Sequence, residues 1–308
     1  MNSSDRKLKL LLIGRHELAC RLLDALYRNA AVDLACVPAR REDTARRPTL
    51  AGLARLRSIP VLGGAELALS DAISLFRPCL LVSAGYDRIV APEVLSRVTR
   101  CVNVHFGMLP KYRGSYSIPW AVLNNDSEIG VTLHDMAPSL DSGAVIRQGR
   151  FPNDLSLSCR DLYDRAVEIG TELATWLIER TIMGDASAGM PQDERQATYY
   201  PPSYPGGFKV PWRQTATYVA NYIRAAHFPP YDGAVGTIAG HRVVFDWPLE
   251  YRLDGPLASP GTVVECNGRP GIAVINGTIL PQAVKFDNHP TVFADAVARC
   301  SLLKQRFA

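Results

Sequence analysis

The sequence predicts an α/β fold in which a doubly wound parallel sheet is followed by a smaller β domain. Short apolar runs rich in β-branched residues alternate with helical patterns over the first two-thirds of the 308 residues. In the last third, short strand-like runs are separated by Gly, Pro and Asn. A stretch rich in Pro, Tyr and Gly, residues 199–211, lies between these two parts.

In the first part, short continuous apolar runs are typical of buried parallel strands. The predicted strands are residues 8–13, 32–37, 79–83, 101–105 and 130–136, and the predicted helices are residues 17–29, 50–57, 65–76 and 158–183. This alternation indicates a Rossmann-like sheet with right-handed crossovers.

After the linker at 199–211, the sequence predicts one helix and several short strands. The helix is residues 215–226, and strands are expected at 243–245, 261–264, 272–275 and 278–279. We therefore predict two domains, residues 1–205 and residues 206–308, of which the second is a small, barrel-like β domain.

The composition is that of a globular protein, with 47% hydrophobic and 21% charged residues. No apolar stretch approaches the roughly 20 residues that cross a bilayer, and residues 8–13 are too short for a signal peptide and lack a cleavage-like site. We thus expect no membrane partner. Seven cysteines, with no Cys-x-x-Cys, favour reduced thiols in a cytoplasm. The His and Cys spacings predict no metal site.

Several common cofactor and catalytic motifs are absent. The first strand runs into Gly14-Arg15-His16 without a Gly-x-Gly-x-x-Gly, so a dinucleotide pyrophosphate would lack its glycine cradle. There is also no Walker loop and no Gly-x-Ser-x-Gly elbow. These absences argue against nicotinamide, nucleotide-hydrolysis and serine-hydrolase chemistry.

An amide, an imidazole and a carboxylate stand close together in the central part of the sequence. Asn103 and His105 share one face of a predicted strand and emerge at its carboxyl end, where open α/β sheets bind ligands. A second strand leads through a Pro-containing loop to Asp141. Each residue alone has an ordinary explanation as a turn former or backbone partner. Their order around a Pro-Lys-Tyr-Arg-Gly loop instead favours acyl and proton transfer without a covalent enzyme intermediate.

The motifs around these residues resemble those of the 10-formyltetrahydrofolate-dependent formyltransferases. They are Asn103-x-His105, Leu109-Pro-x-Tyr-Arg113-Gly114, Trp120-Ala121, Gly130-Val-Thr-Leu-His134 and Leu140-Asp141-x-Gly143. The family includes enzymes that act on glycinamide ribonucleotide, methionyl-tRNA and amino sugars. The resemblance implies formyl transfer from 10-formyltetrahydrofolate to a primary amine, Asn103, His105 and Asp141 as the catalytic set, and an OB-like barrel as the C-terminal domain.

The reaction requires a base, because an alkyl amine with a pKa of about 10 is roughly 99.9% protonated at neutral pH. His105 is the expected base, supported by Asp141, and Asn103 is expected to stabilise the developing oxyanion. By position against the family pattern, two loops are expected to bind the donor. Their residues are Tyr86, Arg88, Ile89 and Val90 in one loop, and Ala137, Pro138, Ser139, Leu140 and Asp141 in the other.

The sequence gives less information about the substrate that accepts the formyl group. Family members often carry Arg-Gly-x-x-Pro, whereas this chain reads Arg113-Gly-Ser-Tyr-Ser-Ile-Pro119, so no acceptor is carried over. Arg113 is a candidate for ion pairing within the protein, for a phosphate or carboxylate contact, or for an exposed loop position. The expected acceptor-binding residues are Arg113, Ser115, Tyr116, Tyr204 and Trp212. The aromatic residues at the linker would either stack on a nucleotide base or pack inside the protein.

The charge pattern weighs against tRNA. Residues 206–308 carry ten Lys and Arg and seven Asp and Glu, which is a weak basic bias for a tRNA-binding domain. A cluster of arginines follows the second strand and either contacts tRNA phosphates or lies on a solvated face. These are Arg40, Arg41, Arg46, Arg47, Arg55 and Arg57. We therefore predict a nucleotide-linked 4-amino sugar as acceptor, with methionyl-tRNA formyl transfer and 10-formyltetrahydrofolate hydrolysis as alternatives, and we consider a homodimer.

Overall fold

The computed structural model describes residues 7–40, 48–63, 68–255 and 258–308. The chain divides into two compact units. Unit 1 comprises Met1–Gly114, Ile129–Phe151 and Asp164–Tyr200, and unit 2 comprises Ser115–Glu128, Pro152–Tyr163 and Pro201–Ala308. Three segments of the predicted first domain, residues 115–128, 152–163 and 201–205, thus group with the C-terminal part of the chain. The predicted domain boundary between residues 205 and 206 stays a prediction.

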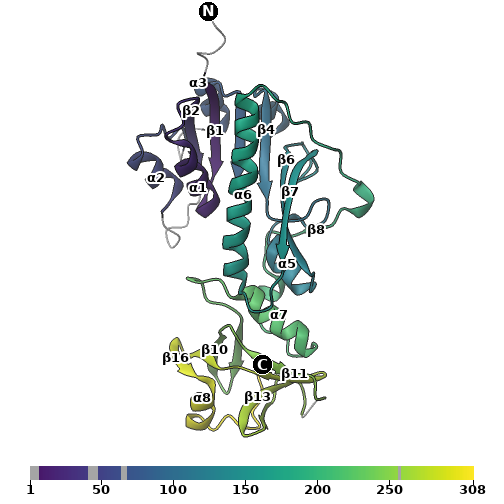
Figure 1. Ribbon diagram of the computed structural model, residues 1–308. Helices are drawn as coiled ribbons and strands as arrows, with labels where there is room; N and C mark the ends of the chain where they lie inside the picture. The colour runs from purple at the N-terminus through teal and green to yellow at the C-terminus, as the bar shows by residue number, and fades with distance from the viewer. Residues whose placement is uncertain (1–6, 41–47, 64–67, 256–257) are drawn as a thin grey trace, which may run out of the picture. The chain divides into compact units, whose positions relative to one another are not determined.

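Unit 1 is built on a six-stranded sheet in the order β2-β1-β3-β4-β6-β7 (Figure 1). The strands are β1 (Leu8–Gly14), β2 (Val32–Pro38), β3 (Leu80–Ala84), β4 (Arg100–His105), β6 (Glu128–Asp135) and β7 (Val145–Pro152). The first four pair in parallel, as predicted from their continuous apolar runs. β6 instead pairs antiparallel with β4, so the sheet is mixed rather than wholly parallel. The predicted α/β, doubly wound class is confirmed.

Helices connect and cover the strands of unit 1. They are α1 (His16–Leu26), α2 (Leu50–Leu56), α3 (Leu69–Phe76), α4 (Pro92–Leu95) and the part of α6 (Cys159–Ile182) that follows residue 163. Figure 1 shows α6 running along the sheet beside β4. A Cβ on Gly170 of α6 would lie 2.9 Å from Val104 of β4, so the missing side chain lets the helix approach the strand closely.

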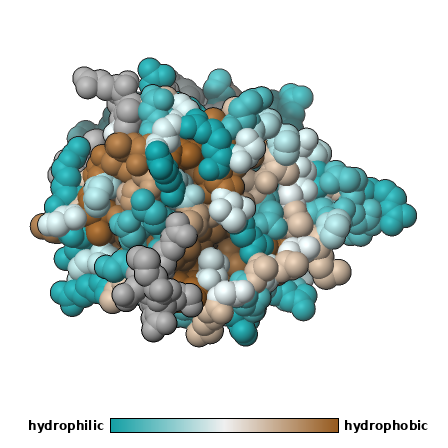
Figure 2. All heavy atoms as spheres, turned by 90° about the horizontal axis from the view of Figure 1, so that it is seen from above, coloured by the Kyte–Doolittle hydropathy of each residue, from teal (hydrophilic) through white to brown (hydrophobic). Residues whose placement is uncertain are grey.

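The core of unit 1 lies on both faces of the sheet. Leu10, Leu11, Leu12 and Ile13 of β1 are all 0% exposed, which explains why the strand reads as a continuous apolar run instead of an alternating one. On the face that Figure 2 presents, hydrophobic residues gather in the middle and hydrophilic residues surround them.

The turn after β1 requires glycine. Gly14 has a φ of +151°, and a Cβ there would lie 2.0 Å from the Ala84 carbonyl oxygen at the end of β3. Its place at the strand end therefore reflects a close backbone approach within the sheet rather than phosphate binding.

Unit 2 contains α5 (Ser117–Leu123), α7 (Ala216–Ala226) and α8 (Phe293–Arg299). It also contains two four-stranded antiparallel sheets, ordered β16-β15-β10-β9 and β11-β14-β13-β12. The strands are β9 (Val235–Ile238), β10 (His241–Phe245), β11 (Glu250–Arg252), β12 (Val263–Cys266), β13 (Arg269–Val274), β14 (Gly277–Leu280), β15 (Ala283–Phe286) and β16 (His289–Val292). The predicted smaller β domain is confirmed.

The stretch predicted as a linker, residues 199–211, contains short elements of regular structure. Tyr199–Tyr200 forms β8, which pairs with β5 (Arg113–Gly114) inside unit 1. A short 3-10 helix, Glu194–Gln196, precedes β8, and a turn at Pro205–Phe208 follows it, in which Gly206 and Gly207 have left-handed backbones. In the described part of the chain, no helix is both long and apolar enough to cross a membrane.

Candidate active site

The strand β4 carries two of the three candidate catalytic residues. Asn103 and His105 are two residues apart, so their side chains lie on the same face of the sheet, as the sequence predicts. Asn103 is half-buried, and His105 is buried with 7% exposure. Neighbouring strands on both sides, β3 and β6, hold β4 in the interior of the sheet.

Both ring nitrogens of His105 face oxygen acceptors. Nε2 lies 2.7 Å from the Tyr112 carbonyl oxygen, and Nδ1 lies 3.5 Å from Asp141 Oδ2. A carbonyl oxygen can only accept, so Nε2 carries a proton in this arrangement. When Nδ1 also takes up a proton, the ring becomes an imidazolium, and each of its two N–H groups then faces an acceptor. The surroundings of His105 therefore suit a group that takes up a proton during a reaction.

Asp141 is delivered by the loop between β6 and β7. Its carboxylate Oδ2 accepts a hydrogen bond from the Gly114 amide at 2.8 Å, and its side chain is only 10% exposed. The residue has a φ of +49°, a left-handed conformation that non-glycine residues rarely adopt and that clusters at functional sites. The structure thus brings Asn103, His105 and Asp141 into one region of unit 1, as the sequence predicts.

His134 belongs to the same cluster, and sequence reasoning did not select it as a site residue. It is 2% exposed. Its Nδ1 lies 2.9 Å from the Asp135 carbonyl oxygen, and its Nε2 lies 3.2 Å from Asn103 Nδ2 and 3.6 Å from Asp141 Oδ1. Because Nδ1 must donate to that carbonyl, a neutral His134 has its lone pair on Nε2 and accepts from the Asn103 amide.

Burial keeps His134 neutral. Desolvation and, secondly, the charge of nearby His105 lower the pKa of His134 from 6.5 to about 4, although the Asp141 carboxylate acts in the opposite direction. The signal that would have found this residue is its position within Gly130-Val-Thr-Leu-His134, combined with the antiparallel register that pairs Asn103 with His134.

A buried threonine anchors the loop after β4. Thr132 is 0% exposed, and its hydroxyl donates to the Gly107 carbonyl at 2.7 Å and accepts from the Leu109 amide at 3.2 Å. Gln148 donates to the same hydroxyl and to the Leu109 carbonyl, at 2.9 Å in each case. A Cβ on Gly107 would lie 2.7 Å from His105 Nε2. The backbone of this loop therefore lies against the His105 imidazole, with no room for a side chain at Gly107.

Arg113 is held inside unit 1. It is 0% exposed, and its guanidinium donates to both carboxylate oxygens of Glu194, at 2.8 and 2.7 Å, and to Gln192 Oε1, at 3.2 and 2.8 Å. It also donates to the Tyr199 hydroxyl at 2.5 Å. Of the alternatives for Arg113, an exposed loop arginine is wrong because the side chain is buried. The contacts favour ion pairing within the protein over a contact with substrate.

The first loop expected to bind the donor has mixed exposure. Val90 is buried in the core cluster that contains Leu11, and Tyr86 packs partly against this cluster. The Tyr86 hydroxyl accepts from Arg88 at 2.6 Å, and Ile89 is 77% exposed. An exposed isoleucine and a half-buried tyrosine in one loop are compatible with the predicted role.

The second expected donor loop follows β6. Pro138, Ser139 and Leu140 are exposed, and Ala137 is half-buried. The Ser139 carbonyl accepts from the hydroxyl of Ser142 at 2.9 Å, which closes the turn that contains Asp141. The backbone of this loop is thus available on the surface of unit 1.

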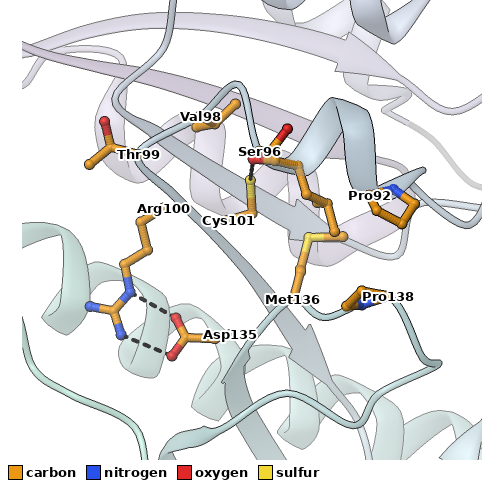
Figure 3. Close-up of a pocket in the computed structure, with 10 residues that line it drawn as sticks. Pro92, Ser96, Val98, Thr99, Arg100, Cys101, Asp135, Met136 and Pro138 are labelled. Carbon is orange, nitrogen blue, oxygen red and sulfur yellow. Dashed lines mark hydrogen bonds and ion pairs between the residues drawn. The ribbon is translucent and has the colours of Figure 1, made fainter.

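A pocket of about 380 Å³ lies between the region of α4 and this second loop. In Figure 3, Pro92 and Ser96 lie on one side of it and Met136 and Pro138 on another. The Arg100 guanidinium donates to the Asp135 carboxylate at 2.8 and 3.4 Å along its border. Of the residues predicted to bind the donor, Pro138 lines this pocket.

The residues expected to bind the acceptor lie mostly in unit 2. Tyr204 and Trp212 are each 5% exposed. The Tyr204 hydroxyl donates to the Tyr222 carbonyl at 2.9 Å, and the Trp212 ring lies 5.2 Å from the Phe245 ring. For these two residues the contacts favour packing over base stacking.

Two other residues expected to bind the acceptor are accessible. Ser115 is half-buried, and Tyr116 is 42% exposed. Tyr116 has a φ of +58°, and its ring makes an edge contact with Tyr204 at a centroid distance of 6.1 Å. Tyr116 therefore remains the aromatic candidate with an accessible ring.

The arginine cluster after the second strand is only partly described. Arg41, Arg46 and Arg47 lie outside the described residues. Arg40 and Arg55 are exposed, and Arg57 forms an ion pair with Asp24 at 2.9 Å. Among the described residues, no group of three or more His, Cys, Asp or Glu side chains is arranged to hold a metal ion.

Comparison with known proteins assigns the family. The formyl transferase family model matches residues 60–178. The chain is 36% identical over 211 residues to the methionyl-tRNA formyltransferase of Moorella thermoacetica, a match covering 68% of this chain and 66% of that protein. It is 30% identical over 318 residues to the corresponding enzyme of Anaeromyxobacter dehalogenans, covering 97% of this chain and 99% of that protein.

A solved structure shares the fold over most of the chain. It is an N-formyltransferase from Helicobacter canadensis in complex with folinic acid and dTDP-3-aminofucose. The TM-score is 0.69 at 24% identity, and the match covers 89% of this chain and 98% of that one. Because the Anaeromyxobacter match spans nearly all of both sequences, the chain belongs to the formyltransferase family.

Proposed function

We propose that this formyltransferase moves the formyl group of 10-formyltetrahydrofolate onto the primary amine of a nucleotide-linked amino sugar. Formyl transfer follows from the family. The donor, the roles of the residues and the acceptor are proposed from the geometry of the site and from what the relatives bind.

The donor is supported by the pocket and by a structural neighbour. The Helicobacter canadensis enzyme holds folinic acid, a formylated tetrahydrofolate. In this chain, the pocket between Leu95 and Met136 is lined by apolar side chains and by the Arg100–Asp135 ion pair. A concave, largely apolar pocket with a few fixed polar groups suits a flat heterocycle. The folate supplies the activated formyl group, and the side chains described above do the remaining work.

His105 is the proposed base. It accepts a proton from the attacking amine, and the charged ring is stabilised by the Tyr112 carbonyl and the Asp141 carboxylate that face its nitrogens. The same proton is then available to the departing nitrogen. Placing the acceptors in advance lowers the cost of forming the imidazolium.

Asn103 is the proposed oxyanion donor. A carboxamide has two N–H bonds, and in this structure one of them points at His134 Nε2. The other is available for the formyl oxygen as negative charge develops on it. Neutral His134 thus orients the amide, because a protonated His134 would present a donor to another donor.

The single observation that carries the choice of acceptor is the charge of the C-terminal region. Its excess of basic over acidic residues is three, and several of the basic groups are already paired or buried. Arg242 and Lys285 both pair with Asp232, Arg269 pairs with Glu250, and Arg224 is 0% exposed. A region with so small a net positive charge is a weak match for a polyanion such as tRNA.

Methionyl-tRNA formyl transfer is the second candidate. The observation that favours it is sequence similarity, since a relative with that name aligns with nearly the whole chain at 30% identity. The solved amino-sugar enzyme has a lower sequence identity to this chain, 24%, and shares its fold.

The decisive experiment is a panel of acceptors supplied with 10-formyltetrahydrofolate. The panel contains nucleotide-linked 3-amino and 4-amino sugars, unlinked amino sugars, initiator methionyl-tRNA and buffer alone. Tetrahydrofolate release is followed by absorbance and the formylated product by mass, with Asn103→Ala as control. We expect product with a nucleotide-linked sugar. Formylation of tRNA alone would overturn the sugar assignment, and equal donor loss in buffer would identify a hydrolase.

A further inference from the structure

We propose that Gln192 is a positioning residue for Asp141, and that buried Arg113 holds Gln192 in place. Gln192 lies 51 residues from Asp141 in the sequence, and its side chain donates to the Asp141 carbonyl oxygen at 2.7 Å. Its effect is to fix the turn that presents the carboxylate to the imidazole. The inference rests on the proposed function only for the catalytic role of Asp141.

The side chain of Gln192 is fully occupied by hydrogen bonds. Its Nε2 donates to the carbonyl oxygens of Asp141 and Gly143, at 2.7 Å each. Its Oε1 accepts from Arg113 Nε at 3.2 Å and from Nη2 at 2.8 Å. An amide has two donors and two acceptor positions, and here all four are used. Gln192 therefore clamps both sides of the turn that contains Ser142.

Arg113 fixes which way the amide of Gln192 points. The guanidinium is 0% exposed and donates to both carboxylate oxygens of Glu194, so it cannot swing toward solvent without breaking a bidentate ion pair. Because a guanidinium only donates, it can face only the oxygen of the Gln192 amide. The two amide hydrogens must then point at the Asp141 turn.

The Asp141 turn needs such a clamp because its backbone is strained. Asp141 has a φ of +49°, a left-handed backbone that costs free energy in a residue with a side chain and that contacts with the rest of the structure must offset. Gly143 has no side chain, and a Cβ there would lie 1.7 Å from the Asp135 carbonyl oxygen. The turn is thus pressed against the end of β6 on one side and tied to Gln192 on the other.

The neighbouring segment fixes the second acceptor of His105. Thr198 accepts through its hydroxyl from the Tyr112 amide at 2.9 Å, and through its carbonyl from the Arg113 amide at 2.9 Å. Tyr112, whose carbonyl faces His105 Nε2, also has a left-handed backbone, with a φ of +63°. Both strained residues that face the imidazole are therefore held by the chain between Gln192 and Tyr200.

The test is Gln192→Glu, which keeps an acceptor for Arg113 but replaces the two donors with an oxygen that repels both carbonyls. The readout is hydrogen exchange at the Gly114 amide, because this group donates to Asp141 Oδ2 and reports whether the carboxylate is in place. We expect exchange at Gly114 to accelerate at least about tenfold. Gln192→Met, which removes donors and acceptor without adding charge, should do the same if Gln192→Glu folds poorly.

The matched control is Gln196→Glu, because the exposed amide of Gln196 donates to Asp193 and not to the Asp141 turn. It should leave Gly114 exchange unchanged. Unchanged exchange at Gly114 in folded Gln192→Glu and Gln192→Met would overturn the proposal. So would equal acceleration in the Gln196→Glu control, since the effect would then be general loosening.

Activity provides an independent arm. Gln192→Glu should lower kcat about tenfold or more, with little change in KM, and should move the acidic limb of the pH–rate profile as Asp141→Asn does. In an Asp141→Asn background the second substitution should add little, because both act through one carboxylate. Additive losses would overturn the proposal. If Asp141→Asn alone turns over normally, the catalytic role of Asp141 fails, while Gly114 exchange still decides the role of Gln192.

Discussion

Asn103 and His134 are register partners across the antiparallel pair of β4 and β6, and Asn103 Nδ2 lies 3.2 Å from His134 Nε2. The carboxamide assigned to the oxyanion is therefore oriented by an imidazole on the next strand. That imidazole is itself fixed by its hydrogen bond to the Asp135 carbonyl. The proposed oxyanion donor thus lies on a strand of the sheet and not on a loop.

Asn103→Ala removes the proposed oxyanion donor. We expect kcat to fall about 100- to 1000-fold, which corresponds to roughly 3 to 4 kcal/mol of transition-state stabilisation, with little change in acceptor KM. Steady-state kinetics with the acceptor found in the panel provide the measurement. Near-normal turnover in a folded Asn103→Ala variant would remove the residue from the mechanism.

Asp141→Asn keeps the size of the side chain but removes the charge that faces His105 Nδ1 at 3.5 Å. Turnover should fall without loss of fold, because the Asn oxygen can still accept from the Gly114 amide. The pH dependence of kcat/KM is the relevant measurement. An acidic limb that does not change would show that the carboxylate does not support the imidazolium.

His134 should make folding stability depend on pH. Burial lowers its pKa from 6.5 to about 4, so between pH 6.5 and 4 the unfolded chain binds more protons at this residue than the folded chain. The contribution of His134 to the free energy of unfolding is therefore fully present above pH 6.5. It falls as the pH is lowered from 6.5 to 4 and levels off below pH 4. Between pH 7.5 and 5 the loss is about 2 kcal/mol.

The measurement is urea unfolding of the wild type and of His134→Asn at pH 7.5 and at pH 5. Between pH 7.5 and pH 5, the free energy of unfolding should fall by roughly 2 kcal/mol less in the variant than in the wild type. Equal acid sensitivity in the two proteins would show that His134 does not titrate as its burial predicts.

Arg224 should be a stability determinant of unit 2. It is 0% exposed, and it donates to the carbonyls of Asp154 and Leu157 at 3.0 and 3.3 Å and to Asn153 Oδ1 at 3.0 Å. Arg224→Met would remove the donors from the buried Asn153 side chain and from two neighbouring carbonyls, at a cost of about 3 kcal/mol. Thermal unfolding of this variant is compared with that of Arg213→Met, an exposed arginine in the same unit. Similar midpoints for the two variants would contradict the assignment.

Salt dependence separates a sugar from a tRNA acceptor. A tRNA held through several phosphates loses orders of magnitude in affinity between about 50 and 200 mM salt, whereas a nucleotide sugar with one diphosphate gives a much shallower slope. We expect the shallow slope. Joint substitution of Arg40, Arg41, Arg46 and Arg47 by Ala should barely alter activity on the true acceptor. Loss of tRNA formylation in this variant, with nucleotide sugars inert for the parent enzyme, would identify the cluster as a tRNA-binding loop.

Local patterns in the sequence were sufficient for most strands and helices of the sheet domain and for part of the site, but they missed β7 and α5. The parallel strands read as continuous apolar runs because both faces of the sheet are covered, and β1 and β2 begin at the predicted residues. Asn103 and His105 could be placed on one face because side-chain direction alternates along a strand. The motif around Asp141 was sufficient to predict that its carboxylate joins them.

The remaining features depend on contacts between residues far apart in the sequence. The antiparallel direction of β6 brings His134 beside Asn103, and no local pattern encodes that direction. Gln192 reaches the Asp141 turn, and Arg113 is buried, only because the chain returns as β8 alongside β5. The sequence by itself determined the fold class and indicated the three groups proposed for catalysis, since these follow from local periodicity and motif. Tertiary structure alone decided which groups orient them, because hydrogen-bond partners are chosen by the path of the chain.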